Sequence, residues 1–389
     1  MDYADRLSRL RSGFDENDLD ALLVTHLPNI RYLCGFTGSA SALIVAERGC
    51  ILFTDGRYRT QAKEEVEAAN VNNLNIAIAR TSPVVAAAEW LAARQGSRRP
   101  GSSTRISVGI EPESITAGMR DRLAAVLKGG TSRATGEGAR LSIKSGKIRL
   151  RSAPPLVERA RMVKDAAEVV RIRRAVELGA GLFRIACRKI RPGVSEVQVA
   201  AAMEYEARCA GAEGMSFPTI LASGARSAIV HGRASSACIP RRGFVVCDFG
   251  VILAGYCSDR TRTVHVGRPS REARKLYDAV LEAQQAAIAA VRPGVTAAEV
   301  DGAARRVLRK SKLARYFTHS TGHGLGLEIH EAPRLAVGQT QKLEPGMVIT
   351  IEPGVYVPGK WGVRIEDVAV VTSSGCEVLT PTDKELVVV

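Results

Sequence analysis

The stretch that decides the fold is Ile190-Arg-Pro-Gly-Val-Ser195-Glu-Val-Gln198-Val199, because a second copy follows it at an offset of 101 residues: Val291-Arg-Pro-Gly-Val-Thr296-Ala-Ala-Glu299-Val300. In each copy a Ser or Thr precedes a Gln or Glu by three positions, which fits a capping box, so each Pro-Gly turn is predicted to begin a helix. A helical stretch precedes each turn, over 165–189 and 271–290. A repeat of this length that occurs twice predicts two similar halves packed about a pseudo-two-fold axis, with any shared site near that axis.

Each half carries two acids on neighbouring strand segments, Asp248 with Asp259 and Glu352 with Glu366. A hairpin that turns at residues 253–254 would set the first two carboxylates directly opposite each other, and a turn centred on Gly359 would do the same for the second two. Four carboxylates at one axis repel each other unless they are protonated or neutralised. Two divalent cations about 3.5–4 Å apart would neutralise them, so the spacing predicts a dinuclear metal site.

Three of the six histidines lie in one glycine-rich stretch, as His319, His323 and His330. Gly322, Gly324 and Gly326 disfavour a helix there, so His319 and His323 are not the helical pair of a zinc protease. His231 follows Pro192 by 39 residues, and His330 follows Pro293 by 37. We therefore expect His231 and His330 to be quasi-symmetric partners on opposite walls of the site.

The first part of the chain, residues 1–155, is predicted to form a smaller α/β domain. A helix is expected over 3–11, a strand over 20–25, and a hairpin from 42–45 to 50–54. Ala153-Pro154-Pro155 breaks regular structure and is the predicted linker, which leaves 156–389 as the second domain.

The composition indicates what kind of protein this is and where in the cell it is expected. Hydrophobic residues make up 46% and charged residues 24%, as in ordinary globular domains. There is no apolar run of about 18 residues, so no membrane span is expected. The charged start, Met1–Arg6, is unlike a secretory signal, and the eight cysteines include no Cys-x-x-Cys pair. We expect reduced thiols and a cytoplasmic location.

The net charge of +15 raises the question of nucleic acid, but the excess is local. Residues 94–161 hold fifteen Lys and Arg against five acids. This segment has few aromatic residues to stack on bases and no DNA-binding motif. We interpret it as a solvated basic face and do not expect nucleic acid as a partner.

Several motifs resemble those of the Xaa-Pro aminopeptidases and prolidases, metallopeptidases with a creatinase-like or "pita-bread" catalytic domain. They are Asp248-Phe-Gly, Ser258-Asp259-Arg-Thr-Arg-Thr263, Thr321-Gly-His323-Gly-Leu-Gly-Leu, His330-Glu331-Ala-Pro333, Ile351-Glu352-Pro-Gly354 and Val363-Arg364-Ile-Glu366-Asp367. Tyr32–Gly38 and Thr54–Tyr58 resemble the family's N-terminal domain. The sequence departs from the family at Arg260, where Ile or Val is usual.

The resemblance implies a ligand set of Asp248, Asp259, His323, Glu352 and Glu366. One imidazole and four carboxylates suit two manganese ions, with cobalt or zinc as alternatives. A metal-activated hydroxide would attack the scissile carbonyl, and Glu352 would carry the proton. His231, His330 and Arg364 are expected to assist catalysis and bind substrate, and His319 to bind substrate.

The resemblance also implies the substrate, a peptide with proline in second position, and a homodimer or homotetramer. Thr54–Tyr58 favours the aminopeptidase, which removes the first residue from longer peptides, over the dipeptidase (prolidase). Two rivals are a metal-free hydrolase of this fold and a binding module that has lost catalysis. The complete ligand set argues against both.

Overall fold

The computed structural model describes residues 1–93, 105–129, 147–381 and 383–389, and much of the basic segment 94–161 lies outside these ranges. The chain divides into two compact units, residues 1–161 and 162–389. The division follows Arg161, beyond the predicted boundary at 155, because helix α6 (Leu156–Met162) is tied to the first unit. Tyr32 Oη donates to the Ala160 carbonyl at 3.2 Å, and Asn29 Nδ2 donates to Glu158 at 2.7 Å.

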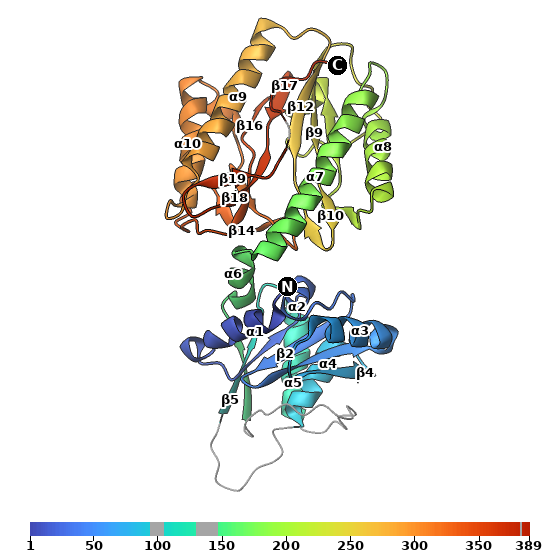
Figure 1. The fold of residues 1–389 in the computed structure, drawn as a ribbon, viewed down its shortest axis with the longest axis vertical. Coiled ribbons are helices and arrows are strands. Elements are labelled where there is room, and N and C mark those ends of the chain that lie inside the picture. The colour runs from blue at the N-terminus through green and yellow to red at the C-terminus, as the bar shows by residue number, and fades with distance from the viewer. Residues whose placement is uncertain (94–104, 130–146, 382) are drawn as a thin grey trace. The chain divides into compact units, whose positions relative to one another are not determined.

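The first unit is built on one six-stranded mixed sheet in the order β4-β3-β2-β1-β5-β6 (Figure 1). The predicted first helix, strand and hairpin are confirmed, with Ser41 paired to Thr54 in the hairpin. Its strands are β1 (Ala21–Val24), β2 (Ser41–Ala46), β3 (Gly49–Asp55), β4 (Leu74–Ala79), β5 (Arg105–Ile110) and β6 (Lys147–Ser152). Its other helices are α1 (Tyr3–Ser12), α2 (Leu27–Cys34), α3 (Arg59–Ala69), α4 (Pro83–Ala92) and α5 (Ala117–Gly129), with short 3-10 turns η1 (Asp15–Asn17) and η2 (Gly56–Tyr58).

The second unit contains two helix pairs, one from each copy of the repeat: α7 (Ala166–Lys189) with α8 (Glu196–Cys209), and α9 (Arg271–Ala290) with α10 (Ala297–Lys310). Both predicted capping boxes are present. The Ser195 hydroxyl accepts from the Gln198 N–H, and the Thr296 hydroxyl accepts from the Glu299 N–H. In return, the side chains of Gln198 and Glu299 accept the backbone N–H of Ser195 and of Thr296. Each pair covers its own hydrophobic core, so the mixed α/β class with two related halves is confirmed.

The strands of the second unit lie between the two helix pairs (Figure 1). They form sheets in the orders β11-β10-β7, β12-β9-β8, β14-β13-β15-β18-β19 and β16-β17. In the first half these are β7 (Gly214–Met215), β8 (Ile220–Ser223), β9 (Gly243–Asp248), β10 (Val251–Leu253), β11 (Tyr256–Cys257) and β12 (Thr261–Val266), with η3 (Gly224–Ala228). In the second half they are β13 (Gly322–Gly324), β14 (Glu331–Leu335), β15 (Val348–Ile351), β16 (Gly354–Val357), β17 (Trp361–Arg364), β18 (Asp367–Val371) and β19 (Cys376–Val378), with η4 (Ala314–Tyr316).

The register expected for the first acid pair is wrong by two residues. Asp248 pairs with Thr261, not with Asp259, because the turn falls at Ala254-Gly255, where both φ angles are positive (48° and 81°). Glycine favours this conformation, and two-residue hairpin turns often require it. A shift of two residues keeps side chains on the same face of the strand, so Asp259 still points toward the site.

The register expected for the second acid pair is confirmed. Ile351 pairs with Asp367 between β15 and β18, and Gly354 pairs with Arg364 between β16 and β17. Glu352 and Glu366 fall between these pairs and therefore face each other. Within the part of the chain that the structure describes, no helix has the length and apolar character that a bilayer crossing requires.

Candidate active site

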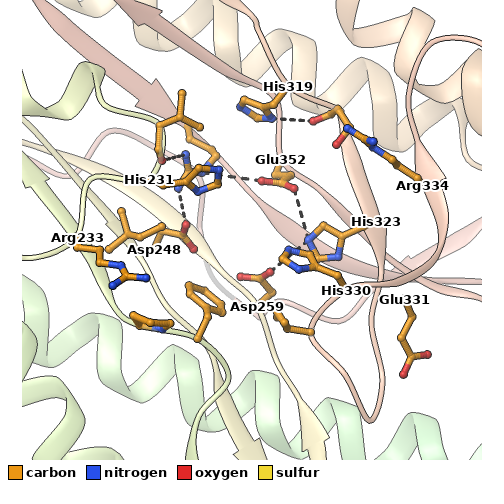
Figure 2. A pocket seen from close by; sticks show the side chains of 17 residues that line it. His231, Arg233, Asp248, Asp259, His319, His323, His330, Glu331, Arg334 and Glu352 are labelled. Carbon is orange, nitrogen blue, oxygen red and sulfur yellow. Dashed lines mark hydrogen bonds and ion pairs between the residues drawn. The ribbon is translucent and has the colours of Figure 1, made fainter. Parts of the chain in front are cut away.

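The second unit contains a cavity of about 570 Å³ that gathers most of the residues predicted from the sequence (Figure 2). The predicted residues that line it are Asp248, Asp259, His323, Glu352, His231, His319, His330 and Arg364. Glu366 does not line the cavity and is only 1% exposed. Three charged residues that sequence reasoning missed also line it: Arg233, Arg334 and Glu331.

Three carboxylates form the most compact group in the site. Asp248 ends β9, Asp259 follows β11, and Glu366 lies between β17 and β18. Each offers one oxygen within 4.8 Å of the other two. One oxygen of Glu366, Oε1, is buried and has no hydrogen-bond partner. A buried carboxylate oxygen without a partner is costly, and a cation among the three acids would satisfy it.

His323 and Glu352 complete the cluster from the second half. The Nε2 atom of His323 lies 3.5 Å from Asp259 Oδ2 and 3.6 Å from Glu352 Oε1. Its Nδ1 lies 2.9 Å from the carbonyl of Gly324, an acceptor, which assigns the proton to Nδ1. Nε2 then turns a lone pair toward carboxylate oxygens, and this is the arrangement of a histidine that binds a metal.

The electrostatics of the cluster favour a bound cation. Burial raises the pKa of Asp259 and of Glu366 well above the ordinary range, and the neighbouring acids raise both further. Burial also raises the pKa of Glu352 to about 8 and lowers the pKa of His323 to about 4. Divalent cations would reverse this preference for protonated acids, because ligand carboxylates bind metal in their ionised form. The donor set therefore fits divalent metal.

Arg364 approaches a different acid from the one suggested by its position in the sequence. Arg364 stands two residues before Glu366, but its Nη2 donates to Asp248 Oδ2. Its Nε donates to Thr261 Oγ1 at 3.0 Å and lies 4.0 Å from Glu352 Oε2. The guanidinium thus holds one acid of the cluster and borders a second.

Tyr356 links Arg364 to His319, and sequence reasoning gave it no role. Arg364 Nη1 donates to Tyr356 Oη at 2.6 Å, and Tyr356 Oη lies 3.0 Å from His319 Nε2. Burial raises the pKa of Tyr356 to about 12 and lowers the pKa of His319 to about 4, so the phenol donates and the imidazole accepts. Two glycines make room for Tyr356: a Cβ at Gly354 would collide with its hydroxyl, and a Cβ at Gly362, its partner in the hairpin, would lie 2.9 Å from its ring.

His231 and His330 both reach the cavity from loops (Figure 2). His231 follows η3, and His330 precedes β14. The ring of His330 packs edge-on against that of His323, with centroids 4.4 Å apart. Burial lowers the pKa of His330, and the nearby His231 lowers it further. Both rings are exposed on the cavity side and can reach a bound molecule.

Comparison with known proteins covers nearly the whole chain. Residues 170–373 match the family model for Metallopeptidase family M24, and residues 6–163 match the Creatinase/Prolidase N-terminal domain. The Xaa-Pro dipeptidase of Pyrococcus horikoshii is 34% identical over 385 residues, which is 98% of this chain and 99% of the relative. The solved Xaa-Pro dipeptidase from Bacillus anthracis has a TM-score of 0.87 at 35% identity, with 100% of both chains covered. The X-Pro aminopeptidase from Thermotoga maritima has a TM-score of 0.81 at 32% identity, with 97% of this chain and 100% of that one covered.

Proposed function

Because the chain belongs to metallopeptidase family M24, as its motifs implied, we propose that it hydrolyses the Xaa–Pro bond of peptides with proline in second position. Two divalent cations would be held by Asp248, Asp259, His323, Glu352 and Glu366. The observation that carries this proposal is the group of three buried carboxylates, with Glu366 Oε1 unsatisfied, beside an open cavity. Manganese suits four oxygen donors and one imidazole, with cobalt or zinc as substitutes.

When bound, the two cations would polarise the scissile carbonyl and acidify water at neutral pH. The chain's own groups would move the proton and hold the substrate. We assign Glu352 the role of proton carrier from the attacking water to the proline nitrogen, because its carboxyl borders His323 and Arg364 and opens to the cavity. His231 and His330 would bind the substrate carbonyl and the charge that develops on its oxygen.

Arg364, Tyr356 and His319 would act mainly by holding Asp248 in place. Arg364 makes three side-chain hydrogen bonds, to Asp248, Thr261 and Tyr356. An arginine with its donors fixed in this way has little freedom to move. His319 also borders the cavity and would contact the substrate there.

We favour the dipeptidase over the aminopeptidase, which differs from the preference that Thr54–Tyr58 suggested. Arg233 and Arg334 line the cavity, and a guanidinium there would bind the free carboxylate of an Xaa-Pro dipeptide. The full-length relatives from P. horikoshii and B. anthracis bear the name Xaa-Pro dipeptidase. The aminopeptidase remains the second candidate, supported by the T. maritima neighbour.

The test compares Xaa-Pro dipeptides with Xaa-Pro-Yaa tripeptides, with metal analysis of the same preparations. A dipeptidase should cleave the dipeptides at least tenfold faster, and Arg334→Ala should raise the KM for dipeptides more than for tripeptides. Cleavage of tripeptides alone would identify the aminopeptidase. Absence of both activities in protein carrying two manganese ions would refute the proposal.

Compartment and assembly follow as secondary proposals. All eight cysteines are free thiols, and four of them (Cys34, Cys50, Cys247 and Cys257) are buried. This supports a reducing, cytoplasmic environment. The homodimer or homotetramer implied by the resemblance is a prediction that light scattering of the purified protein would test.

A further inference from the structure

A buried ion pair lies beside the cavity and outside the ligand cluster. Lys164 Nζ is 3.0 Å from Glu331 Oε2, and the two side chains are only 1% and 6% exposed. Glu331 directly follows His330 and lines the cavity. Lys164 lies 167 positions earlier, in the segment that leads into α7. The metal ligands and the proposed proton carrier make no use of this pair.

Lys164 projects from backbone that is fixed on both sides. Its own N–H donates to the Gly346 carbonyl at 2.9 Å, and the preceding Val163 forms an antiparallel bridge with Met347. A Cβ at Gly346 would lie only 2.9 Å from the Lys164 carbonyl oxygen, so the two chains approach as closely as glycine allows. The ammonium therefore extends from a rigid point, and little further order is needed for it to hold a partner.

Glu331 organises the loop between β13 and β14. Its Oε1 accepts the N–H of Glu328 at 3.1 Å, and the Gly326 N–H donates to the Glu328 carbonyl at 3.0 Å. A Cβ at Gly326 would lie 2.7 Å from Glu331 Oε1, so the carboxylate sits against the turn itself. The Gly326 carbonyl in turn accepts from the Cys257 N–H at 2.7 Å. This loop carries His330 into the cavity.

Because both charged groups are buried, the Lys164–Glu331 ion pair is better suited to fixing the position of nearby side chains than to stabilising the fold. Desolvation of two charges costs about as much as their attraction returns, so such pairs add little net stability but define geometry closely. The geometry at stake here is the position of the His330 ring, which packs on His323.

We propose that Lys164 is a positioning residue that acts through Glu331 to hold His330 at the cavity. This inference rests on the proposed peptidase function, since it assigns His330 a part in that reaction. It adds a residue from the start of the second unit to the machinery of the site, without direct contact to substrate.

The test begins with Lys164→Met, which keeps the aliphatic stem and removes the charge. Its control is Lys360→Met, which removes the lysine of an exposed ion pair with Glu272 (46% and 67% exposed). A misplacement on the order of 1 Å can cost about 100-fold in rate. We expect Lys164→Met to lower kcat about 10- to 100-fold with bound manganese unchanged, and Lys360→Met to leave both quantities unchanged.

A double variant separates positioning from general damage. If Lys164 acts through His330, then Lys164→Met should cost less than about threefold in a His330→Ala background, because coupled residues are not additive. The proposal would be overturned if Lys164→Met lowered kcat as much in the His330→Ala background as in the unaltered protein. It would also be overturned if Lys164→Met lost bound manganese together with kcat. A kcat of Lys164→Met equal to that of Lys360→Met would overturn it as well.

A readout that needs no substrate distinguishes this inference from the proposed function. Amide hydrogen exchange of residues 324–332 should be faster in Lys164→Met than in the unaltered protein, with exchange in α10 unchanged. If the unaltered protein with manganese cleaves no Xaa-Pro peptide, the proposed function fails while the exchange result still tests the link. Unchanged exchange in 324–332 would overturn the inference even in an active enzyme.

Discussion

Replacement of Tyr356 by phenylalanine would test how the cluster is held. Tyr356 is 5% exposed, and its hydroxyl accepts from Arg364 at 2.6 Å and lies 3.0 Å from His319 Nε2. Phenylalanine fills the same space and deletes both hydrogen bonds. Arg364 retains Thr261 Oγ1, Asp248 and the Val230 carbonyl, so it remains partnered but loses the shorter of the two hydrogen bonds that its Nη1 donates.

The expected magnitude follows from the bond to Arg364. A hydrogen bond to a charged group contributes about 1.5–3 kcal/mol. If this hydrogen bond stabilises the transition state but not the bound substrate, its loss lowers kcat roughly 10- to 150-fold, because about 1.4 kcal/mol corresponds to a factor of ten in rate. Bound manganese should stay near two per chain, because Tyr356 forms hydrogen bonds with Arg364 and His319, neither of which is a proposed metal ligand.

The matched control is Tyr277→Phe. Tyr277 is also buried in the second unit, and its hydroxyl donates to the Lys384 carbonyl at 2.8 Å, away from the cavity. This variant should lose about 1 kcal/mol of unfolding free energy and keep full activity. Steady-state kinetics on an Xaa-Pro dipeptide and urea unfolding of both variants provide the measurements. Unchanged kcat in Tyr356→Phe, or an equal loss in Tyr277→Phe, would show that the link to Arg364 does not matter.

Four further outcomes are expected. Chelation should abolish Xaa-Pro cleavage and lower the melting temperature. Adding manganese back at about 100 times its Kd should restore about 2.7 kcal/mol of unfolding free energy, measured by calorimetry. Glu366→Gln replaces an acid whose ionised form is disfavoured by burial and by neighbouring acids, so the metal-free protein should melt higher while bound manganese falls; a lower metal-free melting point with full metal content would contradict this. Gly362→Ala should cost about 1–3 kcal/mol in urea unfolding, because its Cβ would collide with the Ser227 carbonyl. Thr296→Ala should cost about 1 kcal/mol through loss of the α10 cap, and full retention of stability would mean that the capping box contributes nothing.

The sequence by itself determined those features that depend on neighbours a few positions apart. The two capping boxes, the hairpin of the first unit and the register that opposes Glu352 to Glu366 all follow from local hydrogen bonding, strand alternation and turn residues, and all are present. The same local rules placed the turn of the first hairpin one residue too early, at 253–254 and not at Ala254-Gly255. Both positions give a two-residue turn, and the positive φ of Ala254 is not predictable from its residue type.

Only the tertiary structure decided which side chains from distant segments meet. Arg364 reaches Asp248 across 116 positions, and Lys164 reaches Glu331 across 167. No periodicity or spacing links such pairs, because their contact depends on how whole helices and sheets pack. The alternation of residues along a strand predicts which face a side chain lies on, but not which distant residue it contacts there. Burial decides that, because a buried charge without a partner costs too much free energy.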